Sequence, residues 1–239
     1  MAGYHGLIVN QDNPELSTQL PVFYGGRFHA LIPPVVSSPT FVIRIPAKNT
    51  LSLSDLCDNN TITMSEYNSL YASLMARKNI IIAGATSSGK TTIANALLKT
   101  ILDVSPLERF IVIEDNPEIL INSENSTKIL VNSRFSHRDA VISSLRMRPD
   151  RIIIGEIRDG ATAIELCKAW RTGHPGGITT IHASSADDVS KRLYNLFQEV
   201  VMKPDKTLIE SAVEIVVFCE KLMISEGQSV RRVTKFLKT

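Results

Sequence analysis

The chain has little of several features that would place it in a specialised class of protein. Its 239 residues include three cysteines, too widely spaced to form a zinc pair or a disulfide framework. The formal net charge is only +2, which gives no electrostatic argument for a nucleic-acid partner. The single tryptophan, Trp170, lacks interleaved aromatic and basic neighbours, so we interpret it as a packing residue and not a base-stacking one.

Long apolar segments are also missing. The longest apolar runs, such as Ile80–Ala83 and Ile215–Cys219, are far too short to span a bilayer. The N-terminus has no basic region followed by an apolar core, so we expect no signal peptide, and Ala2 breaks the myristoylation pattern. With 44% hydrophobic and 21% charged residues, the composition is that of an ordinary globular protein. We therefore expect a cytoplasmic protein with buried thiols.

The pattern of the chain divides it into three parts. Residues 1–45 have strand composition between Pro- and Gly-containing turns, but they offer too thin a core to stand alone, so we expect them to be the C-terminal part of a larger domain. Residues 46–62 are expected to be a linker with a short helix after Ser52, and residues 63–239 an α/β domain. The strands predicted in the first part are Leu7–Asn10, Arg27–Ile32 and Thr40–Ile45.

Strand and helix patterns alternate through the third part. Thr63 and Glu66 form a capping-box pattern that begins a helix running to about Arg77. Such alternation is typical of a mainly parallel sheet with helices on both faces. The predicted strands are Asn79–Ala83, Arg109–Ile113, Arg151–Ile154 and Ile178–Ile181, the helices are Gly89–Leu102, Ser136–Arg146, Ala161–Trp170 and Ser185–Val200, and Val213–Cys219 with Val230–Leu237 form a late hairpin.

A phosphate-binding loop stands between the first of these strands and its helix. Gly84, Gly89, Lys90 and Thr91 match the pattern G-x-x-x-x-G-K-[ST] in the required strand–loop–helix context. The glycines let backbone N–H groups surround a phosphate chain, and the start of the helix adds its positive end. Lys90 is predicted to reach the β- and γ-phosphates, and the Thr91 hydroxyl to bind Mg²⁺. The predicted ATP-binding residues are Gly84, Ala85, Thr86, Ser87, Ser88, Gly89, Lys90, Thr91 and Thr92.

Carboxylates end two of the predicted strands. Glu114 and Asp115 follow one, and Glu156 follows another. Ligands of such folds lie at the carboxyl edge of the sheet, so these groups can hold Mg²⁺ or polarise an attacking water. We predict Glu156 and Glu114 as catalytic, and Glu156 and Asp115 as metal-associated, although Glu114 and Asp115 also suit ordinary turn chemistry before Asn116-Pro117.

Arginines are the expected source of transition-state charge stabilisation, often from a neighbouring subunit. Arg146 and Arg158 flank the Glu156 strand and are the preferred candidates. The other candidates are Arg27, Arg44, Arg134 and Arg148.

Four segments of the chain occur in an order that is typical of a known protein family. They are GATSSGKTT, VIEDNPEI, LRMRPDRIIIGEIRDGAT and TGHPGGITTIHA. Together they resemble the phosphate loop, Asp box, Walker B segment and His box of the secretion ATPases of type IV secretion and conjugative transfer, in particular the Trb-type conjugal transfer ATPase. GGRFHALIPPVVSSPTFVIRIP is similar to the end of that family's N-terminal, nucleotide-covering domain, where Arg27 and Arg44 would lean over the nucleotide.

The resemblance implies a RecA-like P-loop NTPase core that assembles into a hexameric ring. It also implies an ATP-hydrolysing motor at the inner membrane that energises pilus assembly or substrate transfer with inner-membrane partner proteins. Family members usually have more N-terminal domain than residues 1–45 can provide, so the first domain is expected to be shortened or reduced.

The segment TGHPGGITTIHA carries two histidines. As a metal site it is poor, because seven residues separate the two histidines and no Cys or carboxylate is nearby. The resemblance favours His182 as a sensor near the γ-phosphate and Glu156, and we predict it among the catalytic residues; His174 and its glycine turn would be a mobile coupling element or, for His174, a satisfied core histidine.

Three other functions remain open at this stage. A type II secretion or type IV pilus ATPase is one, although three cysteines cannot make the four-cysteine zinc module of many type II motors. A RecA-like DNA translocase is disfavoured by the near-neutral charge. A nucleotide-gated structural subunit is disfavoured by Glu156, because a pure switch needs no catalytic carboxylate.

Overall fold

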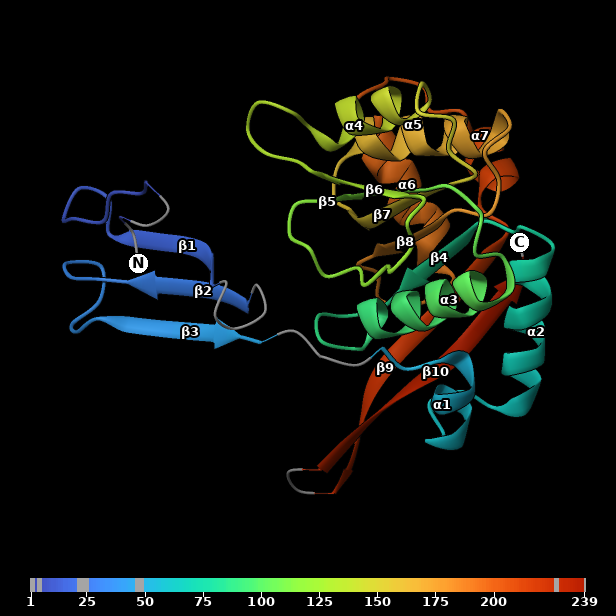
Figure 1. Cartoon of the computed structure of the whole chain (residues 1–239), viewed down its shortest axis with the longest axis horizontal. Coiled ribbons are helices and arrows are strands. Elements are labelled where there is room, and N and C mark those ends of the chain that lie inside the picture. Colours follow the sequence, from blue (N-terminus) through green and yellow to red (C-terminus); the bar gives the residue numbers. More distant parts are fainter. Residues whose placement is uncertain (1–2, 4–5, 21–25, 46–49, 226–227, 239) are drawn as a thin grey trace. The chain divides into compact units, whose positions relative to one another are not determined.

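The computed structural model describes residues 3, 6–20, 26–45, 50–225 and 228–238 (Figure 1). The chain forms two compact units, Met1–Asn49 and Thr50–Thr239. Residues 50–62, part of the expected linker, belong to the larger unit. There α1 (Leu53–Asp58) buries Leu53 and Leu56 in the core.

The smaller unit contains a three-stranded antiparallel sheet. Its strands β1 (Glu15–Leu20), β2 (Gly26–Leu31) and β3 (Thr40–Arg44) lie in chain order, and Leu16, Leu20 and Phe28 form its small core. The strand predicted at Leu7–Asn10 is wrong. That segment is irregular and ends in a turn, because the Asn10 side chain accepts hydrogen bonds from the N–H groups of residues 12 and 13.

The larger unit is an α/β domain around a seven-stranded sheet ordered β10-β9-β4-β8-β7-β5-β6. All neighbouring strands are parallel except the antiparallel β9–β10 pair. The predicted fold class is therefore confirmed. The strands are β4 (Ile80–Ala83), β5 (Phe110–Glu114), β6 (Ser126–Leu130), β7 (Arg151–Ile157), β8 (Ile178–Ile181), β9 (Ile215–Ser225) and β10 (Gln228–Lys238).

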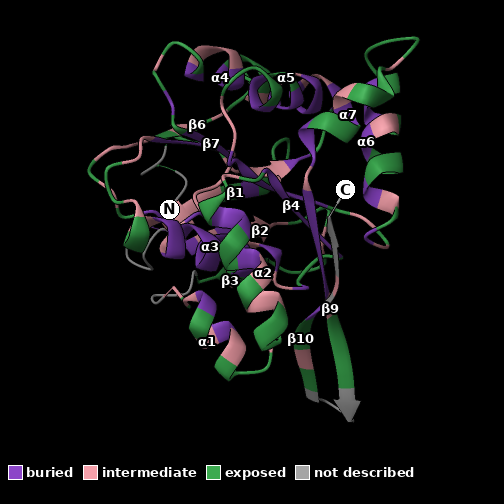
Figure 2. Cartoon of the chain, turned by 90° about the vertical axis from the view of Figure 1, so that its right-hand side faces the viewer, coloured by how far each residue is buried: buried purple, intermediate pink, exposed green. Residues whose placement is uncertain are grey.

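Helices cover both faces of this sheet, and each face has its own apolar core (Figure 1). One face packs against α1, α2 (Met64–Met75) and α3 (Lys90–Val104). The other packs against α4 (His137–Ser144), α5 (Gly160–Arg171), α6 (Asp188–Gln198) and α7 (Lys206–Ala212). Figure 2 shows buried residues concentrated on the central strands, whereas the outer part of the β9–β10 hairpin is largely exposed.

Local capping chemistry explains where the helices begin. The Thr63 capping box forms as predicted, and Ser52 and Ser136 make two others. The Ser185 hydroxyl does accept from the N–H of Asp188, but α6 begins only at Asp188, three residues later than predicted. β1, β6 and α7 were not predicted, because such short segments contain too few repeats of a hydrophobic pattern to be recognised.

A buried polar cluster holds the amino edge of the sheet and the turn that precedes β8. The Asn79 side chain accepts from the N–H groups of Gly176 (2.8 Å) and Gly177 (3.2 Å) and donates to the carbonyl of Ala212 (2.9 Å). The fully buried Arg151 donates to the Gly176 carbonyl (3.0 Å) and pairs with Glu108. One side chain therefore ties together the starts of β4, β8 and β9.

We predict that Asn79→Ala lowers the free energy of unfolding by about 2–4 kcal/mol, because it leaves two buried N–H groups and a carbonyl unpaired. Urea unfolding followed by Trp170 fluorescence measures this, since that indole packs against Gly177. The exposed Asn68→Ala is the matched control and should change stability by less than about 0.5 kcal/mol. Equal effects of the two variants would contradict the assigned role of Asn79.

Candidate nucleotide-binding site

The predicted phosphate loop connects β4 to α3 and has the backbone of an anion cradle. Gly84 and Gly89 adopt φ values of 151° and 104°, and Ser87 has φ 63°. A Cβ on Gly84 would lie 2.3 Å from the carbonyl oxygen of Cys219 on β9, so only glycine fits there. Within the predicted loop Ala85, Thr86, Ser87 and Thr92 are exposed, whereas Gly84 and Ser88 are buried. The loop leads directly into the N-terminus of the 15-residue α3, whose positive end favours phosphate.

Lys90 lies folded into this loop. Its ammonium donates to the carbonyls of Gly84 (3.0 Å) and Ala85 (2.9 Å) and lies 3.2 Å from Nδ1 of His182. Burial lowers the pKa of Lys90, and the nearby negative charge of Glu156 opposes that shift. The lysine is thus held over the loop by groups that a phosphate oxygen can replace.

Glu156 projects from an irregularity in β7. The β7–β8 register shifts between Ile154 and Ile157, which places Gly155 and Glu156 at a bulge. A Cβ on Gly155 would lie 3.2 Å from the Glu114 side chain, so the glycine leaves room for that carboxyl. The bulge therefore places Glu156, the predicted Walker B carboxylate, at the carboxyl edge of the sheet.

Glu156 lies between a histidine and an arginine. His182 Nε2 is 2.8 Å from Glu156 Oε1, an ion-pair distance, and this oxygen accepts no hydrogen bond from the described residues. Arg158 donates from Nε to Glu156 Oε2 (2.9 Å) and from Nη1 to Asp115 Oδ2 (2.6 Å). A continuous chain of contacts thus runs from Lys90 through His182, Glu156 and Arg158 to Asp115.

Glu114 has an environment different from that of Glu156. It is 2% exposed, and its Oε1 accepts from the N–H groups of Glu118 (2.9 Å) and Ile119 (2.8 Å), while Oε2 accepts no hydrogen bond from any residue that the structure describes. Burial raises the pKa of Glu114 to about 7 against the opposing effect of these two hydrogen bonds. Glu114 therefore shapes the backbone on which Glu118 stands.

Glu118 is a site residue that the sequence analysis missed. Its Oε2 accepts from the Thr91 hydroxyl at 3.2 Å, which brings a carboxylate to the predicted magnesium ligand. The Asn95 side chain also holds this segment through the Glu118 carbonyl (3.0 Å). The available signal was a third carboxylate four residues after Glu114, across the Asn116-Pro117 turn.

His137 is a second missed residue. It is the first residue of α4, and burial lowers its pKa while the negative charges of Asp115, Asp159 and Glu156 oppose the shift. The imidazole is therefore within electrostatic range of these carboxylates. The capping box that begins α4 was visible in the sequence, but the place of His137 near these charges depends on how the helix packs.

The other predicted arginines of the larger unit, Arg134, Arg146 and Arg148, lie outside this chain of contacts. Arg146 was expected near Glu156 because Arg146 and Arg158 flank the Glu156 strand. It is exposed and precedes the amino end of β7, and the strand from Arg151 to Glu156 adds roughly 17 Å between them. Arg134 and Arg148 are exposed as well. In the smaller unit Arg27 on β2 and Arg44 on β3 are register partners, so both lie on the same face of that sheet.

The two histidines of TGHPGGITTIHA lie at opposite edges of the sheet. His174 is half-buried near the amino edge, where Nδ1 is 3.3 Å from the Pro149 carbonyl, and His182 follows the carboxyl end of β8. The four-residue β8 connects them. The glycine turn near His174 is held by Asn79 and Arg151, as described above.

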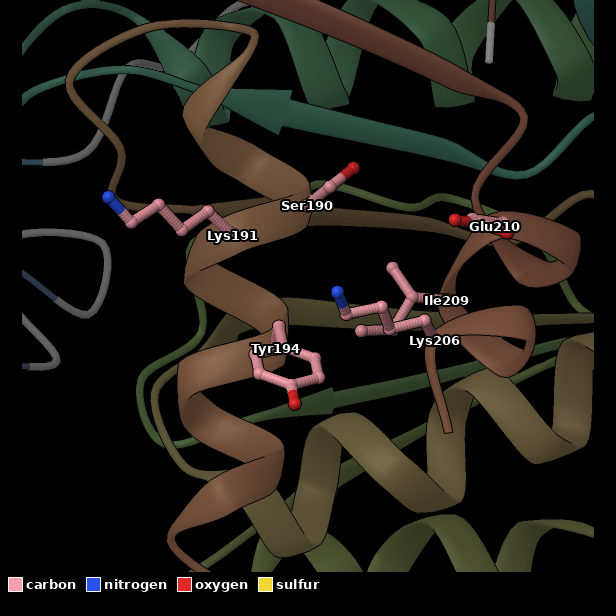
Figure 3. A pocket seen from close by; sticks show the side chains of 6 residues that line it. All are labelled: Ser190, Lys191, Tyr194, Lys206, Ile209 and Glu210. Carbon is pink, nitrogen blue, oxygen red and sulfur yellow. The ribbon is translucent and has the colours of Figure 1, made fainter. Parts of the chain in front are cut away.

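A separate cavity of about 250 Å³ lies between α6 and α7 (Figure 3). The Lys206 ammonium lies over the Tyr194 ring, 5.1 Å from its centre. The cavity is lined by Ser190, Lys191, Tyr194, Lys206, Ile209 and Glu210. None of these residues belongs to the phosphate loop or the carboxylate cluster, so we do not assign the nucleotide to it.

Among the residues described, no group of three His, Cys, Asp or Glu side chains could hold a metal ion. No helix in the described ranges is both long and apolar enough to cross a membrane.

Comparison with known proteins identifies the family. The model of the family described as "Type II/IV secretion system protein" matches residues 18–234. Conjugal transfer protein TrbB of Rhizobium radiobacter is 38% identical over 94% of this chain and 68% of its own length. The type IV secretion system protein VirB11 of Bartonella henselae is 30% identical over 93% of this chain and 74% of its own length.

A solved structure agrees with the sequence relatives. The VirB11 ATPase of the Brucella suis type IV secretion system, in complex with sulphate, is 25% identical with a TM-score of 0.65, covering 99% of this chain and 77% of that one. These matches confirm the resemblance drawn from the four segments, and the chain belongs to the type II/IV secretion system protein family.

Proposed function

We propose that the chain is the ATP-hydrolysing motor of a conjugative type IV secretion system and that it energises pilus assembly or substrate transfer. The contact chain from Lys90 in the phosphate loop to Asp115 carries this proposal, because it joins the phosphate-binding lysine to two carboxylates and an arginine. The TrbB and VirB11 relatives support the conjugative assignment over type II secretion.

Magnesium fits the residues around the loop. Mg²⁺ keeps several waters and takes one or two protein oxygens besides the phosphates, so the absence of a three-carboxylate cage in the described part of the chain is consistent with it. Thr91 would bind it, with Glu118, Glu156 and Asp115 as candidates for its surrounding oxygens. When bound, the ion neutralises charge on the β- and γ-phosphate oxygens.

Each residue around the phosphate loop then has a separate role in hydrolysis. Lys90 exchanges its contacts with the Gly84 and Ala85 carbonyls for phosphate oxygens. Glu118 and Glu156 are the carboxylates that orient the attacking water or accept a proton from it. His182, between Lys90 and Glu156, senses whether the lysine is engaged with the γ-phosphate.

Arginines in this proposal have two roles. Arg158 is a positioning residue, because Glu156 and Asp115 already pair with its guanidinium. The exposed Arg134, Arg146 and Arg148 are candidates to reach a neighbouring subunit's nucleotide. Arg27 and Arg44 would cover the nucleotide from the N-terminal domain, of which residues 1–45 are the C-terminal part.

The same proposal includes the assembly. We place the chain in a homo-oligomeric ring, hexameric by family likeness, at the cytoplasmic face of the inner membrane, where it contacts membrane components of the transfer apparatus. The relatives named as secretion system proteins support a larger apparatus.

We predict that Mg²⁺-dependent ATP hydrolysis per subunit rises with protein concentration, because an arginine from the next subunit completes each site. Lys90→Ala should abolish hydrolysis by preventing phosphate binding, and Glu156→Gln should lower turnover at least about 10²-fold with nucleotide still bound. Unchanged turnover in both variants would contradict the proposed site.

We predict that His182→Ala retains ATP affinity within about threefold but slows turnover by at least about tenfold, because it separates Lys90 from Glu156. Paired measurements of nucleotide binding and steady-state hydrolysis test this. His174→Ala is the matched control at the other edge of the sheet. Wild-type turnover in His182→Ala would rule out the sensor role.

We predict different outcomes for two neighbouring carboxylates. Glu118→Gln should lower turnover by about 10²–10³-fold, because Gln can still accept from Thr91 but cannot take up a proton. Turnover of Glu114→Gln should stay within about tenfold of the wild-type value, because a neutral amide oxygen can accept the same two hydrogen bonds from N–H groups. Steady-state hydrolysis at pH 7 measures both variants. A larger loss of turnover in Glu114→Gln than in Glu118→Gln would contradict the roles proposed for the two carboxylates.

The pH dependence of stability isolates Glu114. Its raised pKa means that the protonated form stabilises the fold; this contribution is complete below about 4.5 and is lost as the pH rises through about 7. Relative to Glu114→Gln, the wild type should therefore lose stability between these pH values. Urea unfolding at a series of pH values measures the difference, and parallel curves would be inconsistent with a buried neutral Glu114.

A further inference from the structure

The C-terminal hairpin brings an arginine onto the phosphate loop. Arg231 on β10 donates from Nε to the carbonyl oxygen of Ser87 at 3.0 Å. Its Cδ lies 3.0 Å from the position that a Cβ on Gly89 would occupy. The side chain therefore lies across the loop between Ser87 and Gly89, although Ser87 is 144 positions earlier in the sequence.

The sheet determines that Arg231 faces the loop. Val233, two residues later on the same face of β10, is buried in the core formed with α1, α2 and α3. The Val233 N–H also donates to the Thr61 carbonyl (2.9 Å), which fixes β10 against the segment before α2. Arg231 is consequently on the face that carries the N-terminus of α3, whereas its neighbour Arg232 points to the other face.

The charges around Arg231 favour an anion. Lys221 on β9 is its direct register partner, so two exposed cations stand side by side on one face. Like charges directly opposite each other in a sheet repel, and a bound anion relieves that repulsion. Lys90 and the positive end of α3 add to the same field.

The contact with Ser87 indicates a second role for Arg231, which is to hold the phosphate loop in its conformation. Ser87 has φ 63°, a conformation that a residue other than glycine adopts only at some cost. The hydrogen bond from Arg231 to its carbonyl holds this peptide in place. Only Nε is used in this bond, so the rest of the guanidinium fork remains at the exposed rim of the loop.

We propose that Arg231 is a nucleotide-binding residue: from the C-terminal hairpin it fixes the phosphate loop at Ser87 and supplies positive charge to the nucleotide bound there. The inference rests on the proposed function, because it takes the phosphate loop as the ATP site. It adds β10 to the elements that build that site.

The test compares two adjacent arginines. Arg231→Ala and Arg232→Ala each remove one positive charge from the same exposed strand, but only the first residue contacts the loop. Binding of a fluorescent ADP analogue with Mg²⁺ to the full chain should weaken about tenfold in Arg231→Ala and less than about twofold in Arg232→Ala. Arg231→Gln, which keeps a polar side chain of similar length without charge, should also weaken binding and guards against a folding defect in the alanine variant.

The salt dependence supplies a readout that a purely structural arginine would not move. Wild-type affinity should fall more steeply with added salt than that of Arg231→Ala, because the variant has lost a charge near the phosphates. Equal affinities in Arg231→Ala and Arg232→Ala, with tight wild-type binding that Lys90→Ala abolishes, would overturn this inference alone. A wild type that binds no nucleotide, or a Lys90→Ala variant that binds normally, would instead overturn the proposed function.

Discussion

The parallel pairing of β4, β8, β7 and β5 is the constraint on which the site depends. Their registers align Ala83 with Ile181 and Ile113 with Ile154, so all four strands end at one edge. The phosphate loop and His182 directly follow β4 and β8, Glu114 is the last residue of β5, and Glu156 lies at the bulge near the end of β7. Residues from four distant parts of the sequence therefore meet because their strands are hydrogen-bonded side by side and buried on both faces.

The charged groups at this edge differ in how the protein accommodates them. Lys90 and Glu114 are buried, and burial shifts the pKa of each towards its neutral form. Asp115, Glu156 and Arg158 are more accessible and form mutual ion pairs. Two carboxyl groups in such different environments are a common basis for different roles in one site. Here it separates Glu114, which shapes the backbone, from Glu156, which faces the loop.

The short β8 links two polar clusters with opposite properties. At its amino end the turn containing Gly176 is tied to Asn79 and Arg151 by buried hydrogen bonds. At its other end His182 is half exposed and contacts groups that ATP would rearrange. Because four buried residues separate the clusters, a displacement of His182 is opposed by a firmly held turn. This arrangement suits a sensor that returns to one position, and it makes a loose, mobile turn around His174 a weaker interpretation.

The amino-acid sequence by itself determined the α/β class, most of the helices and strands of the larger unit, the phosphate loop and the family. These features depend on local periodicity, capping residues and glycine spacing, which act over a few residues. Tertiary structure decided the rest. Glu118 and His137 enter the site only because a turn and a helix pack against Thr91 and Asp115, and Arg146 leaves it because a strand separates it from Glu156. Arg231 reaches the phosphate loop only through the pairing of β10 with β9, a contact between residues 144 positions apart, and no local pattern encodes such a distance.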